Sequence, residues 1–274
     1  MRKITFILLF SVLAIGAKAQ RFEVGGILGF SNYFGDLNPN TSFEILGPSF
    51  GVFVRQNVNT RFSLKYGINY AQISGDDSKS EKPFQLERNL SFKSNLLEMG
   101  AHLEFNFFEL DVRENDKRFS PYLLAGFNMF FYNPKALYRG EWYELRPLGT
   151  EGQTATEYTD REQYNLFNFS FAYGGGFKFR LNRNWQIGIE MANRRAFTDY
   201  LDDVSQTYVA PISLPGGDDG IAAALSDRSG EVGLPIGAPG RQRGTSPKPD
   251  NYLFATFSIS YIFRTDNCPW PGRF

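Results

Sequence analysis

The chain has 274 residues, and its 29 basic and 29 acidic side chains give a formal net charge of zero, which excludes the basic surface typical of nucleic-acid binding. Aromatic residues make up 16% of the chain, with 28 Phe and 14 Tyr beside 27 Gly, a composition unlike that of helical or α/β proteins. One Cys and one His are too few for a Cys/His zinc centre, and beyond the first twenty residues no apolar run is long enough for a transmembrane helix.

The first residues have the pattern of an export signal. Two basic residues precede the apolar run 4–15, and Ala17 and Ala19 form a small-x-small cleavage sequence. We therefore predict a signal peptide over 1–19 and a mature chain that begins at Gln20. Export would place the chain in an oxidising compartment, the periplasm or beyond.

From Arg21 onward the character of the side chains alternates, which is the two-residue period of β-strands. In the clearest segment, 167–181, Phe and Tyr side chains occupy one face, and small or basic side chains occupy the other. Such segments are longer than the roughly five or six residues usual in soluble strands. Eight strands are predicted, at about 22–31, 48–57, 61–72, 94–108, 119–131, 166–180, 185–195 and 251–264.

The connections between these strands alternate between short and long. Short turns on one side and long loops on the other are typical of outer-membrane barrels, whose turns face the periplasm. The sequence thus predicts an all-β fold, an eight-stranded antiparallel transmembrane β-barrel over 20–264, with a periplasmic C-terminal tail at 265–274. The long outer loops are expected at about 32–47, 73–93, 132–165 and 196–250.

The loop 196–250 is punctuated by Gly and Pro, so we expect it to be mostly mobile and exposed, with a short helical turn around 220–227. A soluble barrel of the lipocalin type is the competing interpretation of the whole pattern. The small residues on the polar faces suit a narrow lumen, and the Phe-dense faces would overfill a soluble cup. We therefore favour the transmembrane barrel.

The polar faces would carry charged side chains into the lumen. Acids and bases nearly balance there, and an eight-stranded barrel is only wide enough for side chains, so we predict a closed, salt-bridged core rather than a polar pore. His102 could act as the base of a lipid hydrolase, but its mid-strand, inward position favours a hydrogen-bonded structural role. The predicted lumenal set is Glu23, Arg55, Lys65, Glu98, His102, Glu104, Lys178, Arg180, Glu190 and Arg194.

Acidic residues follow two of the predicted strands and enter the outer loops. Ca²⁺ binds such oxygen clusters, but the EF-hand register of ligands is missing, so we expect neither a metal nor a cofactor. The segment 199–205 follows the seventh strand and is expected to pack against 33–38 and the turn at Gly75, ordering the outer mouth. The acidic residues of this outer rim are Asp36, Asp76, Asp77, Asp199, Asp202 and Asp203.

Cys268 lies in the predicted tail, four residues beyond the last strand. As the single Cys of an exported chain it has no intramolecular partner, which leaves an intermolecular disulfide or a free thiol as alternatives. An even number of strands returns the chain to its starting side. We therefore expect Cys268 at the periplasmic rim, where it could bond to a partner.

Five strings in order along the chain resemble the PorG-type outer-membrane barrel family: YFGDLN at 33–38, GDD at 75–77, FYNP at 131–134, PLGTEGQ at 147–153 and TDYLDDVS at 198–205. The last is the most specific. The resemblance implies a structural, non-catalytic component of the type IX secretion and gliding apparatus in the cell outer membrane. It also implies association with a periplasmic ring lipoprotein (PorK-like) and its partner (PorN-like).

Two other functions remain open at this point. One is a stand-alone OmpA-like barrel that acts as a surface adhesin or membrane stabiliser. The weaker one is an outer-membrane lipid-modifying enzyme, for which a lone inward histidine is poor support. We expect outer-membrane lipid as the surroundings in each case, and neither nucleic acid nor a small-molecule substrate as a partner.

Overall fold

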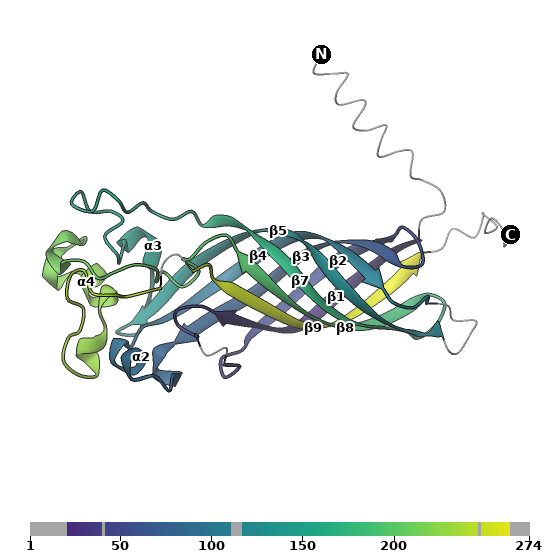
Figure 1. The fold of residues 1–274 in the computed structure, drawn as a ribbon, viewed down its shortest axis with the longest axis horizontal. Coiled ribbons are helices and arrows are strands. Elements are labelled where there is room, and N and C mark those ends of the chain that lie inside the picture. Colours follow the sequence, from purple (N-terminus) through teal and green to yellow (C-terminus); the bar gives the residue numbers. More distant parts are fainter. Residues whose placement is uncertain (1–20, 40–41, 111–116, 246–247, 264–274) are drawn as a thin grey trace, which may run out of the picture.

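The computed structural model describes residues 21–39, 42–110, 117–245 and 248–263. They form one antiparallel sheet in the strand order β4-β3-β2-β1-β9-β8-β7-β5-β6, and a further pairing of β4 with β5 closes it into a barrel (Figure 1). The predicted signal peptide, the tail 265–274 and Cys268 lie outside the described residues. None of the helices in the described part is long and apolar enough to cross a membrane.

Eight strands form the barrel wall, and each one pairs with the strands next to it along the chain or, for β1 and β9, with each other. Their lengths run from 11 residues in β2 to 20 in β5, long enough to span a bilayer when tilted. The strands are β1 (Arg21–Phe34), β2 (Gly47–Asn57), β3 (Phe62–Asp76), β4 (Ser91–Asn106), β5 (Phe119–Tyr138), β7 (Phe167–Arg180), β8 (Trp185–Ala196) and β9 (Asn251–Phe263).

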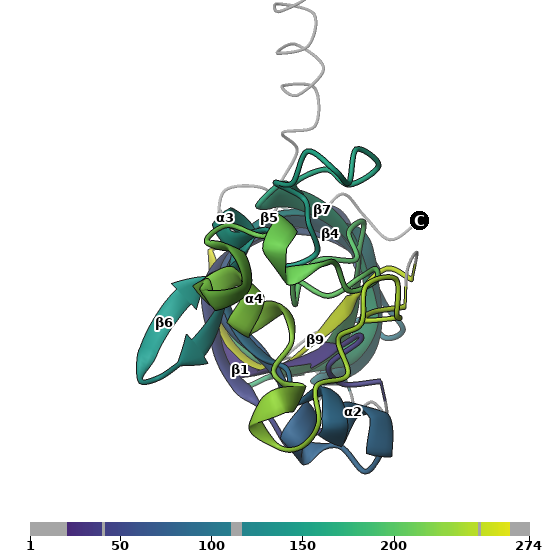
Figure 2. The ribbon, with the colours of Figure 1, turned by 90° about the vertical axis from the view of Figure 1, so that its left-hand side faces the viewer.

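The loop expected at 132–165 begins as strand. β5 continues past the barrel wall to Tyr138 and turns back into β6 (Glu141–Glu144), so the expectation of a loop from residue 132 is wrong. The two turn residues, Arg139 and Gly140, both have positive φ, 50° and 88°. Two such residues match the right-handed twist of a tight hairpin. The hairpin projects sideways from the barrel (Figure 2).

The outward face of the barrel is apolar. Leu28, Phe127 and Ile189 are 68%, 62% and 61% exposed. Asn128 and Glu190, which alternate with the last two, are buried inside the barrel. A soluble barrel would have the opposite arrangement, so the lipocalin alternative is wrong. An apolar surface that surrounds the whole barrel fits a lipid environment. The chain therefore has the fold of the outer-membrane β-barrels.

The two ends of the barrel differ. The turns 58–61 and 181–184, the start of β1 and the end of β9 lie at one end, and the long loops lie at the other (Figure 1). Aromatic pairs line the turn end on the outside, among them Phe62 with Phe105 at 5.2 Å and Trp185 with Tyr261 at 5.3 Å between ring centroids. Aromatic girdles mark the interface levels of such barrels, and short turns mark the periplasmic side.

The long loops fold over the barrel mouth (Figure 2). The expectation that 196–250 is mostly exposed is wrong, because the segment 201–205, Leu225 and Arg243 are buried. The expected helical turn is present as α4. The short helices at this end are η1 (Asp77–Lys79), α2 (Pro83–Arg88), α3 (Leu145–Leu148), η3 (Pro211–Ser213), η4 (Gly217–Asp219), α4 (Ile221–Ser226) and η5 (Ser229–Glu231).

Candidate functional site

The structure places all ten predicted lumenal residues inside the barrel, where each is buried. Their positions follow from strand alternation, since cross-strand partners share a face: Arg55 lies opposite Lys65, and Lys65 lies opposite His102. Buried charges are costly unless they are paired and hydrogen-bonded. Their partners inside the barrel therefore determine what the lumen can do.

Glu104 is the centre of the lumenal charges on the side of the periplasmic turns. Its carboxylate lies 2.7 Å from Arg55 Nε, 2.5 Å from Lys178 Nζ and 3.6 Å from Lys65 Nζ. Arg55 also reaches Glu23, with Nη1 2.7 Å from Oε2. Three cations from three strands therefore converge on one fully buried carboxylate.

Two further carboxylates occupy the lumen. Glu190 forms an ion pair with Lys65 and accepts a hydrogen bond from the Tyr122 hydroxyl at 2.7 Å. Glu98 lies 3.2 Å from Arg194 Nε and accepts a hydrogen bond from the Tyr252 hydroxyl, also at 2.7 Å. Arg180, at the turn end, donates to the carbonyl of Leu110 at 3.0 Å and to Gln186 at 3.4 Å. These contacts tie together strands on opposite sides of the barrel.

His102 is buried in the lumen and bonds through Nε2 to Asn128 Oδ1 at 2.7 Å. The Asn128 amide in turn donates to the Ser170 hydroxyl at 3.2 Å. An asparagine side chain thus stands between the imidazole and the serine. A nucleophile–base pair needs direct hydrogen-bond contact, so this arrangement favours the structural interpretation of His102.

An aromatic layer closes the lumen above the charges. Tyr164 stacks on Tyr200 with ring centroids 4.8 Å apart, and Tyr33 meets Phe92 edge-on at the same distance. These rings come from the strands and from the loops, so the layer joins the barrel wall to the long outer loops. The layer includes Tyr33, Phe92, Phe130, Tyr132, Tyr164, Tyr200, Tyr252 and Phe254.

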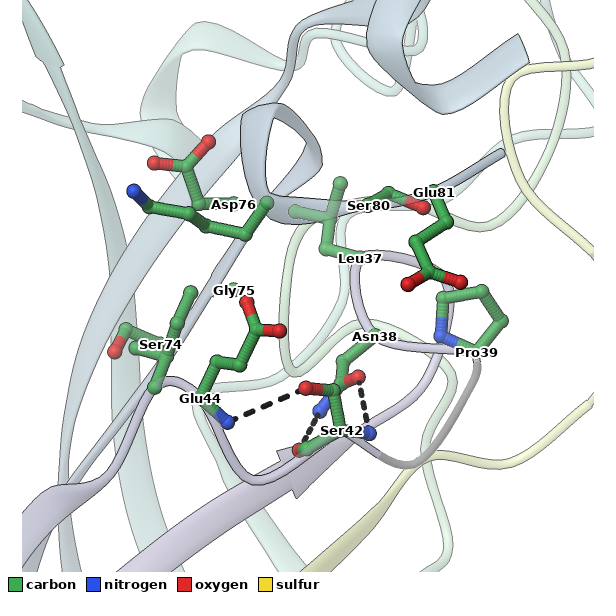
Figure 3. A pocket seen from close by; sticks show the side chains of 12 residues that line it. Leu37, Asn38, Pro39, Ser42, Glu44, Ser74, Gly75, Asp76, Ser80 and Glu81 are labelled. Carbon is green, nitrogen blue, oxygen red and sulfur yellow. Dashed lines mark hydrogen bonds between the residues drawn. The ribbon is translucent and has the colours of Figure 1, made fainter. Parts of the chain in front are cut away.

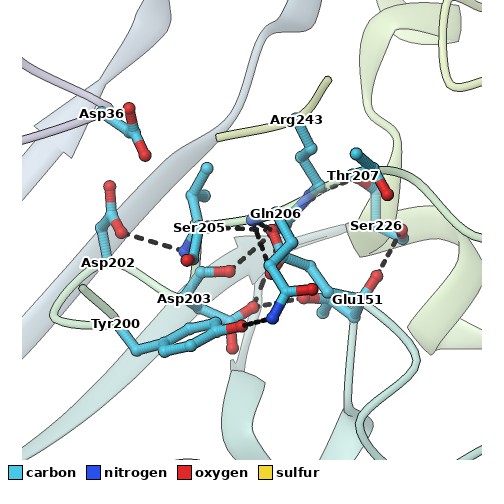
Figure 4. A network of polar contacts seen from close by, with 12 residues as sticks. Asp36, Glu151, Tyr200, Asp202, Asp203, Ser205, Gln206, Thr207, Ser226 and Arg243 are labelled. Carbon is cyan, nitrogen blue, oxygen red and sulfur yellow. Dashed lines mark hydrogen bonds and ion pairs between the residues drawn. The ribbon is translucent and has the colours of Figure 1, made fainter. Parts of the chain in front are cut away.

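Arg243 holds the loops together over this layer (Figure 4). The Arg243 side chain is buried. Its Nη1 atom lies 3.0 Å from Glu151 Oε1 and 2.7 Å from the carbonyl oxygen of Asp203. Nε donates to the carbonyl of Ser226 at 3.0 Å. Glu151 also accepts from the backbone N–H of Ser205 at 2.9 Å. One arginine therefore joins three separate stretches of the outer loops, and we call this group of loops the cap.

A second arginine joins the cap to the β3–β4 loop. Arg88 makes a bidentate ion pair with Asp77, at 2.7 Å from Nε and 2.8 Å from Nη2. Its remaining donors reach the carbonyl of Arg243 at 2.6 Å and the carbonyl of Asp36 at 2.8 Å. The Asp36 carboxylate accepts from the N–H of Thr245 at 2.9 Å. The four long connections, β1–β2, β3–β4, β5–β7 and β8–β9, are thus tied to one another.

Tyr33 donates toward two buried carboxyl groups. Its hydroxyl oxygen lies 2.6 Å from Asp202 Oδ2 and 2.9 Å from Asp250 Oδ1. A hydroxyl has one proton to donate, so two ionised carboxylates cannot both be satisfied by it. Burial raises the pKa of Asp202 well above its ordinary value, and the nearby Asp36 carboxylate adds to this. Burial and then Asp202 raise the pKa of Asp250 in the same way.

Two more aspartates of the cap titrate near neutral pH. Burial raises the pKa of Asp199 to about 7, although the hydrogen bond from Ser205 lowers it. Burial also raises the pKa of Asp203 to about 6, although Arg243 and Thr150 oppose the shift. Aspartate in an unfolded chain has a pKa near roughly 4. Between that pH and the raised pKa values, the folded cap therefore holds protons that the unfolded chain would release.

We expect the cap to become less stable as pH rises from about 4 to about 7, because a raised carboxyl pKa means that the folded state binds more protons in that window. Limited proteolysis of the cap at pH 5 and pH 8 measures this. Asp199→Asn should flatten the dependence, and comparison with the natural chain at each pH cancels the protease's own pH profile. A cap equally resistant at both pH values would contradict the assignment.

The structure brings most of the predicted outer-rim residues into one network. Asp36, Asp77, Asp202 and Asp203 belong to the cap contacts, and Asp199 accepts from the Ser205 hydroxyl at 2.7 Å. Asp76 instead accepts from the N–H of Ser78 at 2.9 Å and caps η1. Arg88, Glu151, Arg243 and Asp250 were not among the predicted site residues.

A cavity of about 170 Å³ lies between the β1–β2 loop and the start of the β3–β4 loop (Figure 3). Glu44, Asp76 and Glu81 give it an acidic lining, with Lys79 as the base. In the part of the chain that the structure describes, His, Cys, Asp and Glu side chains form no cluster able to hold a metal ion. We assign no chemistry to this cavity.

A family model described as domain of unknown function DUF6089 matches residues 2–209. The chain belongs to this family. No curated protein matches it significantly. The family description gives no activity.

Solved outer-membrane proteins are similar in outline. Neisserial surface protein A is 8% identical, with 90% of this chain and 98% of that chain covered and a TM-score of 0.41. The N-terminal barrel domain of Pseudomonas aeruginosa OprF is 9% identical, covering 89% and 97%, with a TM-score of 0.38. A major outer membrane protein from Thermus thermophilus is 13% identical, covering 90% and 100%, with a TM-score of 0.40. The fold assignment rests on the strand pairings of this chain itself.

Proposed function

We propose that this protein is a structural, non-catalytic component of the type IX secretion and gliding machinery that anchors a periplasmic ring to the outer membrane. The observation that carries the proposal is the interior of the barrel, which is filled by ion pairs and covered by a cap held by Arg243. A barrel filled in this way suits a rigid anchor better than a pore. The five strings that resemble the PorG-type family are the reason for proposing this particular machine.

The periplasmic end offers a surface for such a partner. Val58 and Phe108 lie in the turns at this end and are 50% and 57% exposed. Both side chains stand beyond the paired part of the strands, and we place the contact with the periplasmic ring at them. The proposed partners are a ring lipoprotein (PorK-like) and its partner (PorN-like).

Co-purification from detergent extracts tests the anchoring role. An affinity-tagged chain should retain the PorK-like and PorN-like proteins, and the double variant Val58→Glu with Phe108→Glu should lose them while keeping heat-modifiable migration. Leu234→Glu is the matched control, because Leu234 is 87% exposed in the cap on the opposite side of the membrane. Extracts in which the tagged natural chain retains neither ring protein would contradict the proposal.

The stand-alone barrel is the second candidate. The cap presents apolar side chains to the outside, with Leu234 and Ile212 87% and 69% exposed, as a surface adhesin would need. The same variants, compared for target binding, separate the two functions. An adhesin should bind its target through the cap, so Leu234→Glu would impair it and the turn variants would not.

A further inference from the structure

A groove of about 510 Å³ lies on the outer wall of the barrel, over β3, β4 and β5, next to the β5–β6 hairpin. Its lining changes in character along the strands. Toward the turns it contains Leu97 and Phe131, which are 55% and 51% exposed and belong to the apolar outer surface. Toward the loops it contains two lysines, Lys93 and Lys135. The groove therefore crosses the level where the lipid-facing surface ends.

Strand register arranges this lining in rows. Tyr70, Leu97 and Phe131 are cross-strand neighbours, and so are Gln72, Asn95 and Asn133 one step closer to the loops. Lys93 pairs with Lys135 in the next row. Successive rows on one face are two residues apart, so the lysine row lies about 13 Å from the Leu97 row, measured along the strands. An apolar row, an amide row and a basic row therefore follow one another from the lipid-facing surface toward the loops.

The hairpin supplies the wall on the loop side. Trp142 of β6 pairs with Leu137 and is 52% exposed, and Lys93 Nζ lies 5.5 Å from the centroid of its ring. The hairpin stands away from the barrel wall (Figure 2), and Trp142 lines the groove together with both lysines. An indole held in this position can cover a sugar or glycerol moiety while the lysines contact a charge.

The charges of the groove leave a net positive site. Lys135 Nζ lies 2.9 Å from Glu144 Oε1, an ion pair whose side chains are 38% and 48% exposed. Lys93 has no carboxylate within ion-pair distance among the described residues, and its ammonium group lies over the Trp142 ring. Lys93 is thus free to bind an anion, and Lys135 can contact the same anion while it keeps its ion pair with Glu144.

We propose that this groove binds a phosphate-bearing lipid of the outer leaflet. The phosphate lies between Lys93 and Lys135, and the amide row receives hydroxyl or amide groups of the headgroup. The acyl chains continue down the wall past Leu97 and Phe131. The apolar row opens directly onto the lipid-facing surface, which is why the occupant is a lipid and not a free anion. This inference is independent of the secretion role.

Native mass spectrometry of the detergent-purified full-length protein tests the proposal. The probes are diphosphorylated lipid A, the same lipid with both phosphates removed, and inorganic phosphate. The natural chain should retain the phosphorylated lipid about tenfold more strongly than the dephosphorylated one, the order expected for one good charge-assisted contact. Inorganic phosphate at millimolar concentration should not compete.

The double variant Lys93→Gln with Lys135→Gln should lose this preference and keep heat-modifiable migration. Lys79→Gln with Lys82→Gln is the matched control, because both lysines are exposed at the same end of the barrel but lie outside the groove. Equal retention of the two lipids by the natural chain, an unchanged preference in the groove variant, or full competition by inorganic phosphate would each overturn the proposal.

Discussion

Glu104→Gln is expected to lower the free energy of unfolding of the barrel by about 3–5 kcal/mol, the usual cost of removing one partner from a buried ion pair. Glu104 is fully buried and compensates three cations, Arg55, Lys65 and Lys178. The glutamine keeps the size and some hydrogen bonds but leaves excess positive charge inside the wall. Urea unfolding in lipid vesicles, followed by tryptophan fluorescence, measures the change.

Glu87→Gln is the matched control for this variant. Glu87 lies exposed on α2, where loss of one carboxylate should change the unfolding free energy by less than about 0.5 kcal/mol. Equal stability of Glu104→Gln and Glu87→Gln would mean that the lumenal charges are solvated and unpaired, and it would contradict the closed core.

Arg243→Met is expected to release the cap while the barrel stays folded. The methionine preserves much of the apolar volume but leaves Glu151 buried without its ion-pair partner and removes the hydrogen bonds to Asp203 and Ser226. A loss of about 3–5 kcal/mol is expected for the cap. The measurement is the rate of proteolytic cleavage within 196–250 on intact barrels, which should rise by at least about a hundredfold.

Arg241→Met controls for the loss of a nearby positive charge. Arg241 is exposed, and its side chain donates to the carbonyl of Ile236 at 3.2 Å. Cleavage of this variant should match that of the natural chain. A cap that stays resistant in Arg243→Met would show that apolar packing around Leu201 and Leu225 alone holds the loops, contrary to the account given above.

The barrel and its lumen could be predicted from the sequence because strand alternation fixes which side chains point inward. Once Phe169 and Phe171 are assigned to the outside, Lys178 and Arg180 must lie inside, whatever their partners are. Which charges meet was not predictable, since pairing across the lumen depends on barrel stagger. The convergence of three cations on Glu104 is visible only in three dimensions.

The cap could not be predicted in the same way. Arg243 sits in a Gly-rich stretch with no hydrophobic period, and nothing local distinguishes it from the exposed Arg241 two residues earlier. Its burial follows from contacts with Glu151 and Asp203, which are far away in the sequence. The string 198–205 drew attention to Asp202 and Asp203, but their partners Tyr33 and Arg243 come from other loops.

The ion pairs in the lumen and the contacts within the cap have a common consequence for function. Ion pairs across the lumen tie strands on opposite sides of the barrel together, and Arg243 and Arg88 tie the outer loops to one another. A rigid platform loses little conformational entropy when a partner binds. This property suits an anchor for a larger assembly, and it also makes the groove beneath Trp142 a preformed site.

Conductance in planar lipid bilayers shows whether the barrel is closed from end to end. The purified natural chain should insert without measurable current, because ion pairs fill the lumen and the cap covers the mouth. Insertion is verified by heat-modifiable migration of protein recovered from the same lipid. Reproducible single-channel steps from the natural chain would contradict the account.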